Sequence, residues 1–202
     1  MTHIRDRILQ PDQPEDFGRW SAALDRARIP ILFRDAKLEL VKDEKVRDTL
    51  SWMINTPAEW VENPRSPFIC GPFNTGKSAA AAILAMDMVA RCASVMWIAT
   101  RDIPGVRFEK TPAAAALNAR LETLDLLVMD DLGAQGFKLS GAGGTAIEDV
   151  ARIMYERKRP VVYTSNSVWA QVSTQYAELR GFVSLLERTC VPVVMTKTWG
   201  RS

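Results

Sequence analysis

The sequence predicts an α/β fold in which a parallel five-stranded sheet is covered by helices on both faces. Five short apolar segments alternate with stretches of helical pattern, so each strand is expected to be buried on both sides. One of these segments leads directly into a glycine-rich loop and a helix-forming stretch, over residues 67–86. The chain has 202 residues, of which 47% are hydrophobic and 25% charged. This composition suits one globular domain with a full-sized core.

Two helices are predicted before the first strand. The first runs from about residue 16 to 27 and carries Phe17, Trp20 and Leu24 on one face. That apolar stripe suits either a helix that covers the core or one that docks onto a partner. The proline-containing segment 29–33 ends the pattern, and a second helix follows over residues 43–54 with apolar residues at helical spacing: Val46, Leu50 and Met53.

The glycine-rich loop has the spacing G-x-x-x-x-G-K-S that cradles phosphates. Its residues are Gly71, Pro72, Phe73, Asn74, Thr75, Gly76, Lys77 and Ser78. A strand, this loop and a helix in that order place backbone N–H groups and a helix N-terminus around a polyphosphate. Lys77 is expected to reach the β- and γ-phosphates, and the Ser78 hydroxyl to bind Mg²⁺. Asn74 tolerates positive φ better than other non-glycine residues, so the loop is expected to form.

The third predicted strand, within residues 124–130, ends in two acidic residues, Asp130 and Asp131. At the carboxyl end of a buried parallel strand, Asp130 is expected to hold Mg²⁺ directly or through water. Asp131 is then placed to orient or deprotonate an attacking water. The alternative is that the two residues open a surface loop. The phosphate loop upstream favours the functional interpretation.

The fourth predicted strand, 160–165, is followed by Asn166, whose amide is a candidate for positioning the γ-phosphate or the attacking water. A turn after the strand is the alternative, since Ser-Asn-Ser forms turns easily. The last strand is predicted within residues 191–196. Pro192 lies in it and argues for a late start or an edge position.

Several classes of protein are excluded by composition. The net charge of +2 is too small to show nucleic-acid binding, although a local basic surface remains open. The chain has three separated cysteines and one histidine, His3, so a zinc site is not expected. The charged N-terminus does not resemble a signal peptide. The longest apolar segment is interrupted by Asp87 and is too short to span a membrane. A cytoplasmic protein is expected.

These motifs together resemble an AAA+ ATPase, and more narrowly the DnaC-type helicase loaders of bacteria and phages and the related IstB-type transposition ATPases. The resemblance runs from about residue 29 to the C-terminus and includes segment 29–36, the phosphate loop, the Asp-Asp-Leu-Gly of 130–133 and segment 155–166. It implies an AAA+ ATPase domain over 29–202 without a helical lid, after an extension at 1–28 that is a possible docking helix. ATP and Mg²⁺ are the implied cofactors, and slow hydrolysis is implied for the isolated subunit.

The resemblance also implies partners. Family members self-associate in an ATP-dependent manner, act on a hexameric replicative DNA helicase and bind single-stranded DNA. An arginine from one subunit reaches the γ-phosphate held by the next. Ser184 stands where the family often has that arginine, so Arg180 and Arg188 remain as alternatives.

The residues themselves offer a few candidates for the DNA contact. Segment 101–120 follows the second strand and contains Arg101, Arg107, Phe108 and Lys110. Cations beside an aromatic ring suit backbone contact and base stacking, although a solvated loop is the alternative. The glycine-rich stretch 136–144 is predicted to be a mobile loop. An IstB-like regulator of a transposase and a nucleotide-gated adaptor with little turnover remain alternative functions.

Overall fold

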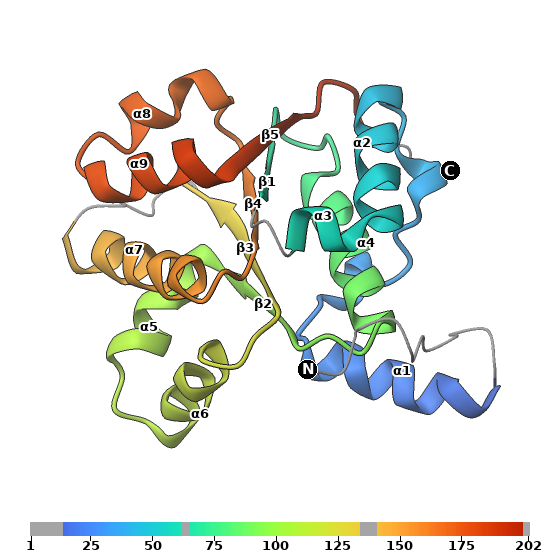
Figure 1. The fold of residues 1–202 in the computed structure, drawn as a ribbon, viewed down its shortest axis with the longest axis horizontal. Coiled ribbons are helices and arrows are strands. Elements are labelled where there is room, and N and C mark those ends of the chain that lie inside the picture. The colour runs from blue at the N-terminus through green and yellow to red at the C-terminus, as the bar shows by residue number, and fades with distance from the viewer. Residues whose placement is uncertain (1–13, 62–64, 134–140, 200–202) are drawn as a thin grey trace.

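The centre of the molecule is a sheet of five parallel strands in the order β2-β3-β4-β1-β5 (Figure 1). The computed structural model describes residues 14–61, 65–133 and 141–199. The parallel five-stranded sheet confirms the fold class predicted from the sequence. The strands are β1 (Ser66–Cys70), β2 (Val95–Ala99), β3 (Leu126–Leu132), β4 (Val161–Ser165) and β5 (Cys190–Val194).

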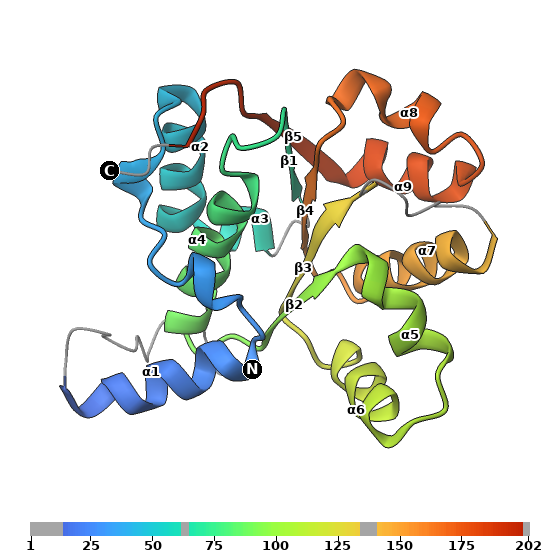
Figure 2. The ribbon, with the colours of Figure 1, turned by 180° about the vertical axis from the view of Figure 1, so that it is seen from behind.

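Helices cover both faces of this sheet, as Figures 1 and 2 show from opposite sides. One face carries α1 (Pro14–Arg26), α2 (Glu44–Asn55), α3 (Pro57–Val61) and α4 (Lys77–Ala90). The other carries α5 (Ile103–Phe108), α6 (Pro112–Leu121), α7 (Gly141–Glu156), α8 (Val172–Gln175) and α9 (Arg180–Thr189). Four short 3₁₀ turns complete the described elements: η2 (Ile31–Phe33), η3 (Leu38–Leu40), η4 (Thr100–Asp102) and η5 (Trp169–Gln171).

The two faces form two separate hydrophobic cores because side chains alternate along each strand. In β1, Ile69 belongs to the core on the α4 side, while Phe68 and Cys70 belong to the core on the α7 side. All three side chains are fully buried. A strand that is apolar on both faces therefore leads into the phosphate loop, which makes the base of that loop rigid.

The N-terminal helices are part of the packed structure. Asp43 caps α2 by accepting the Val46 N–H, and the predicted helix 43–54 is confirmed within one residue at each end. In α1, Trp20 is partly buried and Leu24 is buried, both against the core on the α4 side. The Ala27 carbonyl accepts the N–H of Trp97 on β2 at 2.8 Å, which ties the end of α1 to an edge strand. The described part of the apolar stripe thus covers the core, and the side chain of Phe17 lies outside the described residues.

Other expectations have mixed outcomes. Strand β5 lies at the edge of the sheet, as Pro192 predicted. The solvated loop considered for 101–120 is instead folded into η4, α5 and α6. Residues 134–140 of the glycine-rich stretch lie outside the described residues, and Gly141 to Gly144 open α7 rather than a loop.

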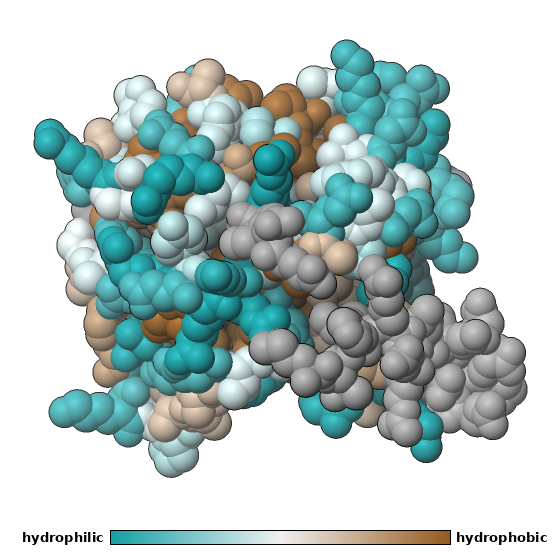
Figure 3. All heavy atoms as spheres, in the orientation of Figure 1, coloured by the Kyte–Doolittle hydropathy of each residue, from teal (hydrophilic) through white to brown (hydrophobic). Residues whose placement is uncertain are grey.

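The surface is mostly hydrophilic over α5, α6 and α7 (Figure 3). Hydrophobic atoms gather near the position of β5 in the same view, and Val194 of this edge strand is 46% exposed. Within the part of the chain that the structure describes, no helix combines the length and the apolar character needed to cross a membrane.

Candidate nucleotide-binding site

The loop between β1 and α4 adopts a shape that few residue types allow. Asn74 and Gly76 have φ angles of 61° and 87°, which lie in the left-handed region. The tolerance expected of Asn74 is thereby confirmed. Gly71 also needs to lack a side chain, because a Cβ there would come within 2.1 Å of the Met195 carbonyl oxygen. The glycines of the motif are therefore required by backbone geometry.

Lys77 is folded back over this loop. Its side chain is buried, and Nζ donates a hydrogen bond to the Pro72 carbonyl at 2.7 Å. Burial lowers the pKa of Lys77, while the nearby carboxylates of Asp131 and Asp130 oppose that shift. Because Nζ donates here to an uncharged carbonyl, its charge is suited to a phosphate oxygen that enters the loop.

A chain of hydrogen bonds joins the loop to the ends of β3 and β4. Ser78 Oγ donates to Asp130 Oδ1 at 2.9 Å, and Thr164 Oγ1 donates to the same oxygen at 2.6 Å. Thr164 Oγ1 in turn accepts the backbone N–H of Asp131 at 2.8 Å. The predicted metal ligands Ser78 and Asp130 are therefore brought together, although 52 residues separate them in the sequence.

The surroundings of Asp130 disfavour its ionised form. Burial raises the pKa of this carboxyl group, hydrogen bonds from Thr164 and Ser78 lower it, and the charge of Asp131 raises it further. The net direction is upward, so the ionised carboxylate is under-compensated in the folded protein. A divalent cation beside Asp130 would supply the missing compensation.

Asp131 and Asn166 face each other across β3 and β4. The pairing of these strands shifts between Met129 and Leu132, and Asp131 within this bulge has a φ of 61°. The bulge re-aims successive side chains, as irregularities next to active sites commonly do. Asn166 Nδ2 donates to Asp131 Oδ1 at 3.3 Å. The two residues predicted to act on a water molecule are thus adjacent.

The residues present fit a bound nucleoside triphosphate with Mg²⁺. Gly76 is the N-cap of α4 and carries no capping side chain, so the first N–H groups of this helix are available to phosphate oxygens. No group of three or more His, Cys, Asp or Glu residues suited to a metal occurs among the described residues. Mg²⁺ is usually held by one or two protein oxygens together with substrate phosphates, and Ser78 and Asp130 meet that need.

Some residues of the site had no clear signal in the sequence. Thr100 Oγ1 donates to the Asp130 carbonyl at 2.8 Å, and Arg101 lies beside it. A small cavity of about 100 Å³ is lined by Ala99, Thr100, Arg101, Asp130 and Asp131. Thr164 belongs to the polar cluster 164–166 that the sequence places at this strand end, but its contact with both aspartates had no signal. Thr100 had no signal, since polar residues after a strand are common in turns, and Arg101 was expected only as a candidate for the DNA contact.

The two candidate arginines lie at different places on α9. Arg188 is near the amino edge of the sheet: it precedes Cys190, which pairs with Ser66, the first residue of β1. Its guanidinium lies 5.4 Å from the centre of the Tyr155 ring. The phosphate loop leaves the opposite end of β1. The structure therefore does not bring Arg188 to the other predicted site residues.

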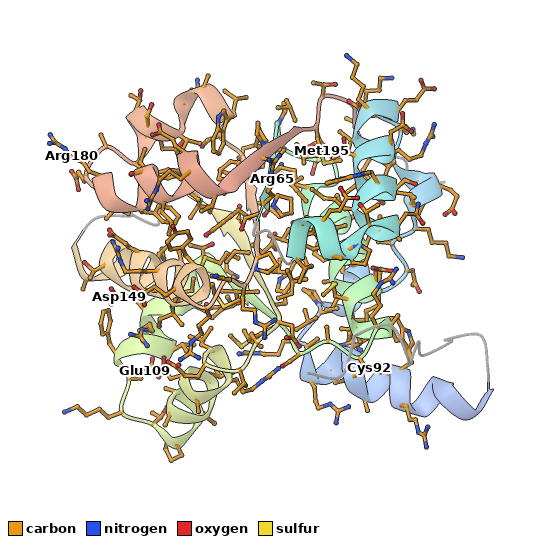
Figure 4. All side chains as sticks on the ribbon, viewed as in Figure 1. Arg65, Cys92, Glu109, Asp149, Arg180 and Met195 are labelled. Atoms are coloured by element: carbon orange, nitrogen blue, oxygen red, sulfur yellow. The ribbon has the colours of Figure 1, made fainter. Side chains whose placement is uncertain are left out.

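Arg180 begins α9 nearer to the carboxyl edge. It follows Tyr176, whose hydroxyl donates to the Leu132 carbonyl at 3.3 Å and lies 3.3 Å from Ser165 Oγ. Leu132 and Ser165 are the last residues of β3 and β4. Figure 4 shows Arg180 pointing away from the body of the molecule. Its position is open to a second molecule.

Fold and candidate site together define a parallel α/β domain with a phosphate-binding loop motif between β1 and α4. No model of a known protein family matches the sequence, and no curated protein sequence matches it. Solved structures do match. The crystal structure of DnaI aligns with a TM-score of 0.67 and 16% identity over 83% of this chain and 94% of that one.

The crystal structure of the DnaC helicase loader gives a TM-score of 0.65 at 16% identity, over 82% of this chain and 99% of that one. The replication initiator DnaA, bound to AMPPCP and single-stranded DNA, gives 0.61 at 18% identity over 82% of this chain and 51% of that one. At these identities the likeness establishes the fold. The chain shares the fold of DnaI, the DnaC helicase loader and DnaA.

Proposed function

We propose that this protein is an ATPase that assists DNA replication as a loader of the replicative helicase. The observation that carries the proposal is the hydrogen-bonded chain from Ser78 through Asp130 and Thr164 to Asp131, placed directly beside a phosphate loop. Residues 29–202 form the ATP-binding unit in this proposal, and residues 1–28 are an N-terminal extension. The fold shared with the DnaC helicase loader supports the choice of partner.

Each residue of the site has a task in this proposal. The backbone N–H groups from Gly71 to Ser78 and the Lys77 ammonium hold the phosphates, while Ser78 and Asp130 hold Mg²⁺. The bound Mg²⁺ would neutralise charge on the phosphates. Asp131 accepts a proton from the attacking water and Asn166 orients that water, since both side chains lie at the same strand ends.

Hydrolysis is expected to need a second copy of the chain. Arg180 is exposed at the start of α9, on the side where β3 and β4 end, whereas Arg188 lies near the opposite edge. Arg180 is therefore the better candidate for the arginine that reaches the neighbour's γ-phosphate. An ATP-dependent oligomer places one such arginine at each shared site.

Single-stranded DNA is the proposed nucleic-acid ligand, and the DnaA structure bound to single-stranded DNA supports it at the level of fold. Of the candidate contacts, Arg107 is tied to Asn118 Oδ1 at 3.0 Å and lies 4.0 Å from Asp149 Oδ2. Phe108 is 51% exposed, and Lys110 is also exposed. Phe108 and Lys110 are thus better placed than Arg107 to bind DNA.

The DNA contact is tested by measuring the affinity for a fluorescent oligo-dT. Lys110→Ala and Phe108→Ala should each weaken binding, and Lys110→Ala should also reduce its salt dependence. Arg157→Ala is the matched control, because Arg157 is paired with Glu122 on the surface. If Lys110→Ala and Phe108→Ala both bind as the wild type does, the proposed contact is wrong.

The first test of the loader function is light-scattering chromatography with the replicative helicase of the host, in ATP and Mg²⁺ and then in ADP. A complex that forms in ATP and is lost in Lys77→Ala would support the proposal and give the stoichiometry. If no complex forms with either nucleotide, the helicase is not the partner. A duplex-DNA transposase complex would then be tested in the same way.

A further inference from the structure

The segment that follows β5 lies against the phosphate loop. We name residues 195–199 the carboxyl-terminal clasp. Its first residue, Met195, donates its N–H to the Cys70 carbonyl at 2.7 Å and places its own carbonyl against Gly71. Figure 4 shows Met195 where the chain leaves β5 toward α2. The clasp therefore begins by fixing the point at which the loop leaves β1.

Trp199, at the other end of the clasp, contacts the middle and the end of the loop. Its backbone N–H donates to the Asn74 carbonyl at 3.0 Å. Its indole ring packs on Gly76 so closely that a Cβ at Gly76 would lie 2.1 Å from ring atom Cε3. Asn74 and Gly76 are the two loop residues between Pro72 and Lys77 with positive φ. Trp199 thus contacts both residues with positive φ in this part of the loop.

The clasp is also anchored on its far side. Thr196 Oγ1 donates to Asp43 Oδ2 at 2.9 Å, and this hydrogen bond is the main cause that lowers the pKa of Asp43. Asp43 in turn caps α2 by accepting the Val46 N–H through its other carboxylate oxygen. The clasp consequently spans from the first turn of α2 to the phosphate loop, and Trp199 packs against the core to which α2 and α4 contribute.

We propose that Trp199 is a positioning residue that holds the phosphate loop in its binding shape, so that nucleotide affinity depends on the clasp. This inference rests on the proposed binding of ATP. Asn74 at φ 61° is in a conformation that non-glycine residues seldom adopt, and Gly76 has wide conformational freedom, so the loop has other shapes to adopt when nothing packs on it. The affinity for a ligand falls in proportion to the fraction of molecules that hold the competent shape. Without the indole ring, that fraction falls.

The experiment compares two probes, Mg-ATP and Mg-tripolyphosphate, by calorimetric titration of the full chain at a temperature where every variant is folded. Trp199→Ala should weaken both probes by a similar factor, about tenfold if one molecule in ten keeps the competent loop. Trp199→Phe should restore most of the affinity, because a ring still packs on Gly76. Trp52→Ala, which removes a 42% exposed tryptophan on α2, is the matched control and should bind both probes normally.

Comparing the two probes distinguishes a residue that holds the loop in shape from one that contacts the base of ATP directly. If Trp199→Ala weakens ATP but leaves tripolyphosphate unchanged, the indole contacts the nucleoside and the inference is overturned. Thr196→Val offers a milder variant at an exposed position, should Trp199→Ala fold poorly. It releases the clasp from Asp43 and should weaken both probes by about twofold or more, since fewer molecules keep the competent loop. If Trp199→Ala cannot be measured, unchanged binding of both probes to Thr196→Val would also overturn the inference.

Failure of this inference is distinct from failure of the proposed function. If the wild type binds neither probe more tightly than Lys77→Ala does, the nucleotide site is wrong, and the role of the clasp is overturned with it. If the wild type binds both probes and Trp199→Ala binds them equally well, the site stands and only the role of Trp199 is wrong.

Discussion

Replacing Thr164 with valine removes one buried hydroxyl that joins both acidic residues of the site. Thr164 is 1% exposed, and its Oγ1 donates to Asp130 Oδ1 at 2.6 Å while accepting the Asp131 N–H at 2.8 Å. Valine has nearly the same shape, so the change leaves no cavity. It does leave the Asp131 N–H without this acceptor, and it removes one of the hydrogen bonds that lower the pKa of Asp130.

The expected loss of stability can be worked from these contacts. A buried backbone N–H without a partner costs about 1–3 kcal/mol, and a hydrogen bond to a charged group contributes about 1.5–3 kcal/mol. Because one hydroxyl makes both contacts, the two effects are not fully additive, and a total of about 2–4 kcal/mol is expected. With a urea slope of about 2 kcal/mol per molar, the unfolding midpoint should fall by about 1–2 M.

The assay is urea unfolding followed by circular dichroism, with ATP turnover measured on the same preparations. Thr164→Ser keeps the hydroxyl and is the matched control, so it should retain most of the stability and activity. Thr164→Val should also lose ATP turnover, since the Thr164 hydroxyl no longer fixes the positions of Asp130 and Asp131 relative to each other. A midpoint for Thr164→Val within about 0.3 M of the wild type, which is about 0.6 kcal/mol, would refute the reasoning.

Three further predictions follow from the same geometry. Because burial raises the pKa of Asp130, its ionised carboxylate destabilises the folded protein. Asp130→Asn, which is neutral, should therefore raise the melting temperature at pH 7. The difference in melting temperature should disappear as the pH falls through the raised pKa toward 3.8, since Asp130 is then protonated in both states. Asn166→Ala should leave ATP binding intact and slow turnover about 10²-fold, measured by single-turnover kinetics; normal turnover would contradict its positioning role. Arg180→Ala should leave ATP binding unchanged and abolish turnover. Arg188→Ala should keep turnover and lose only about 0.5–1 kcal/mol of stability from its contact with Tyr155. Loss of turnover in Arg188→Ala alone would show that Arg188, not Arg180, reaches the neighbour's phosphate.

The sheet and the loop were predictable because local sequence decides them. Apolar strand segments, the G-x-x-x-x-G-K-S spacing and the polar residues after each strand are all short-range patterns. Parallel strands bring their carboxyl ends to one edge, so Ser78, Asp130 and Asn166 could be expected to meet before any coordinates were known. Pro192 predicted an edge strand for an equally local reason, since proline cannot donate to a sheet ladder.

Long-range contacts were not predictable in this way. The folded helices of 101–120 were not anticipated, because a mixture of charges, prolines and glycine suits a loop equally well. The bulge that gives Asp131 a φ of 61° depends on the pairing of β3 with β4, which the local sequence does not reveal. The choice between Arg180 and Arg188 required knowing that α9 runs from near the end of β4 to the start of β5.

The sequence by itself determined the class of fold and the chemical groups of the nucleotide site, because each depends on residues close together in the chain or on the regular geometry of a parallel sheet. Only the tertiary structure decided which residues support that site. Thr164 bridges the two aspartates, and Trp199 packs on Gly76 across 123 residues of sequence, the difference between their numbers. Such contacts form when elements distant in the sequence pack together, and no periodicity or motif in the sequence predicts them.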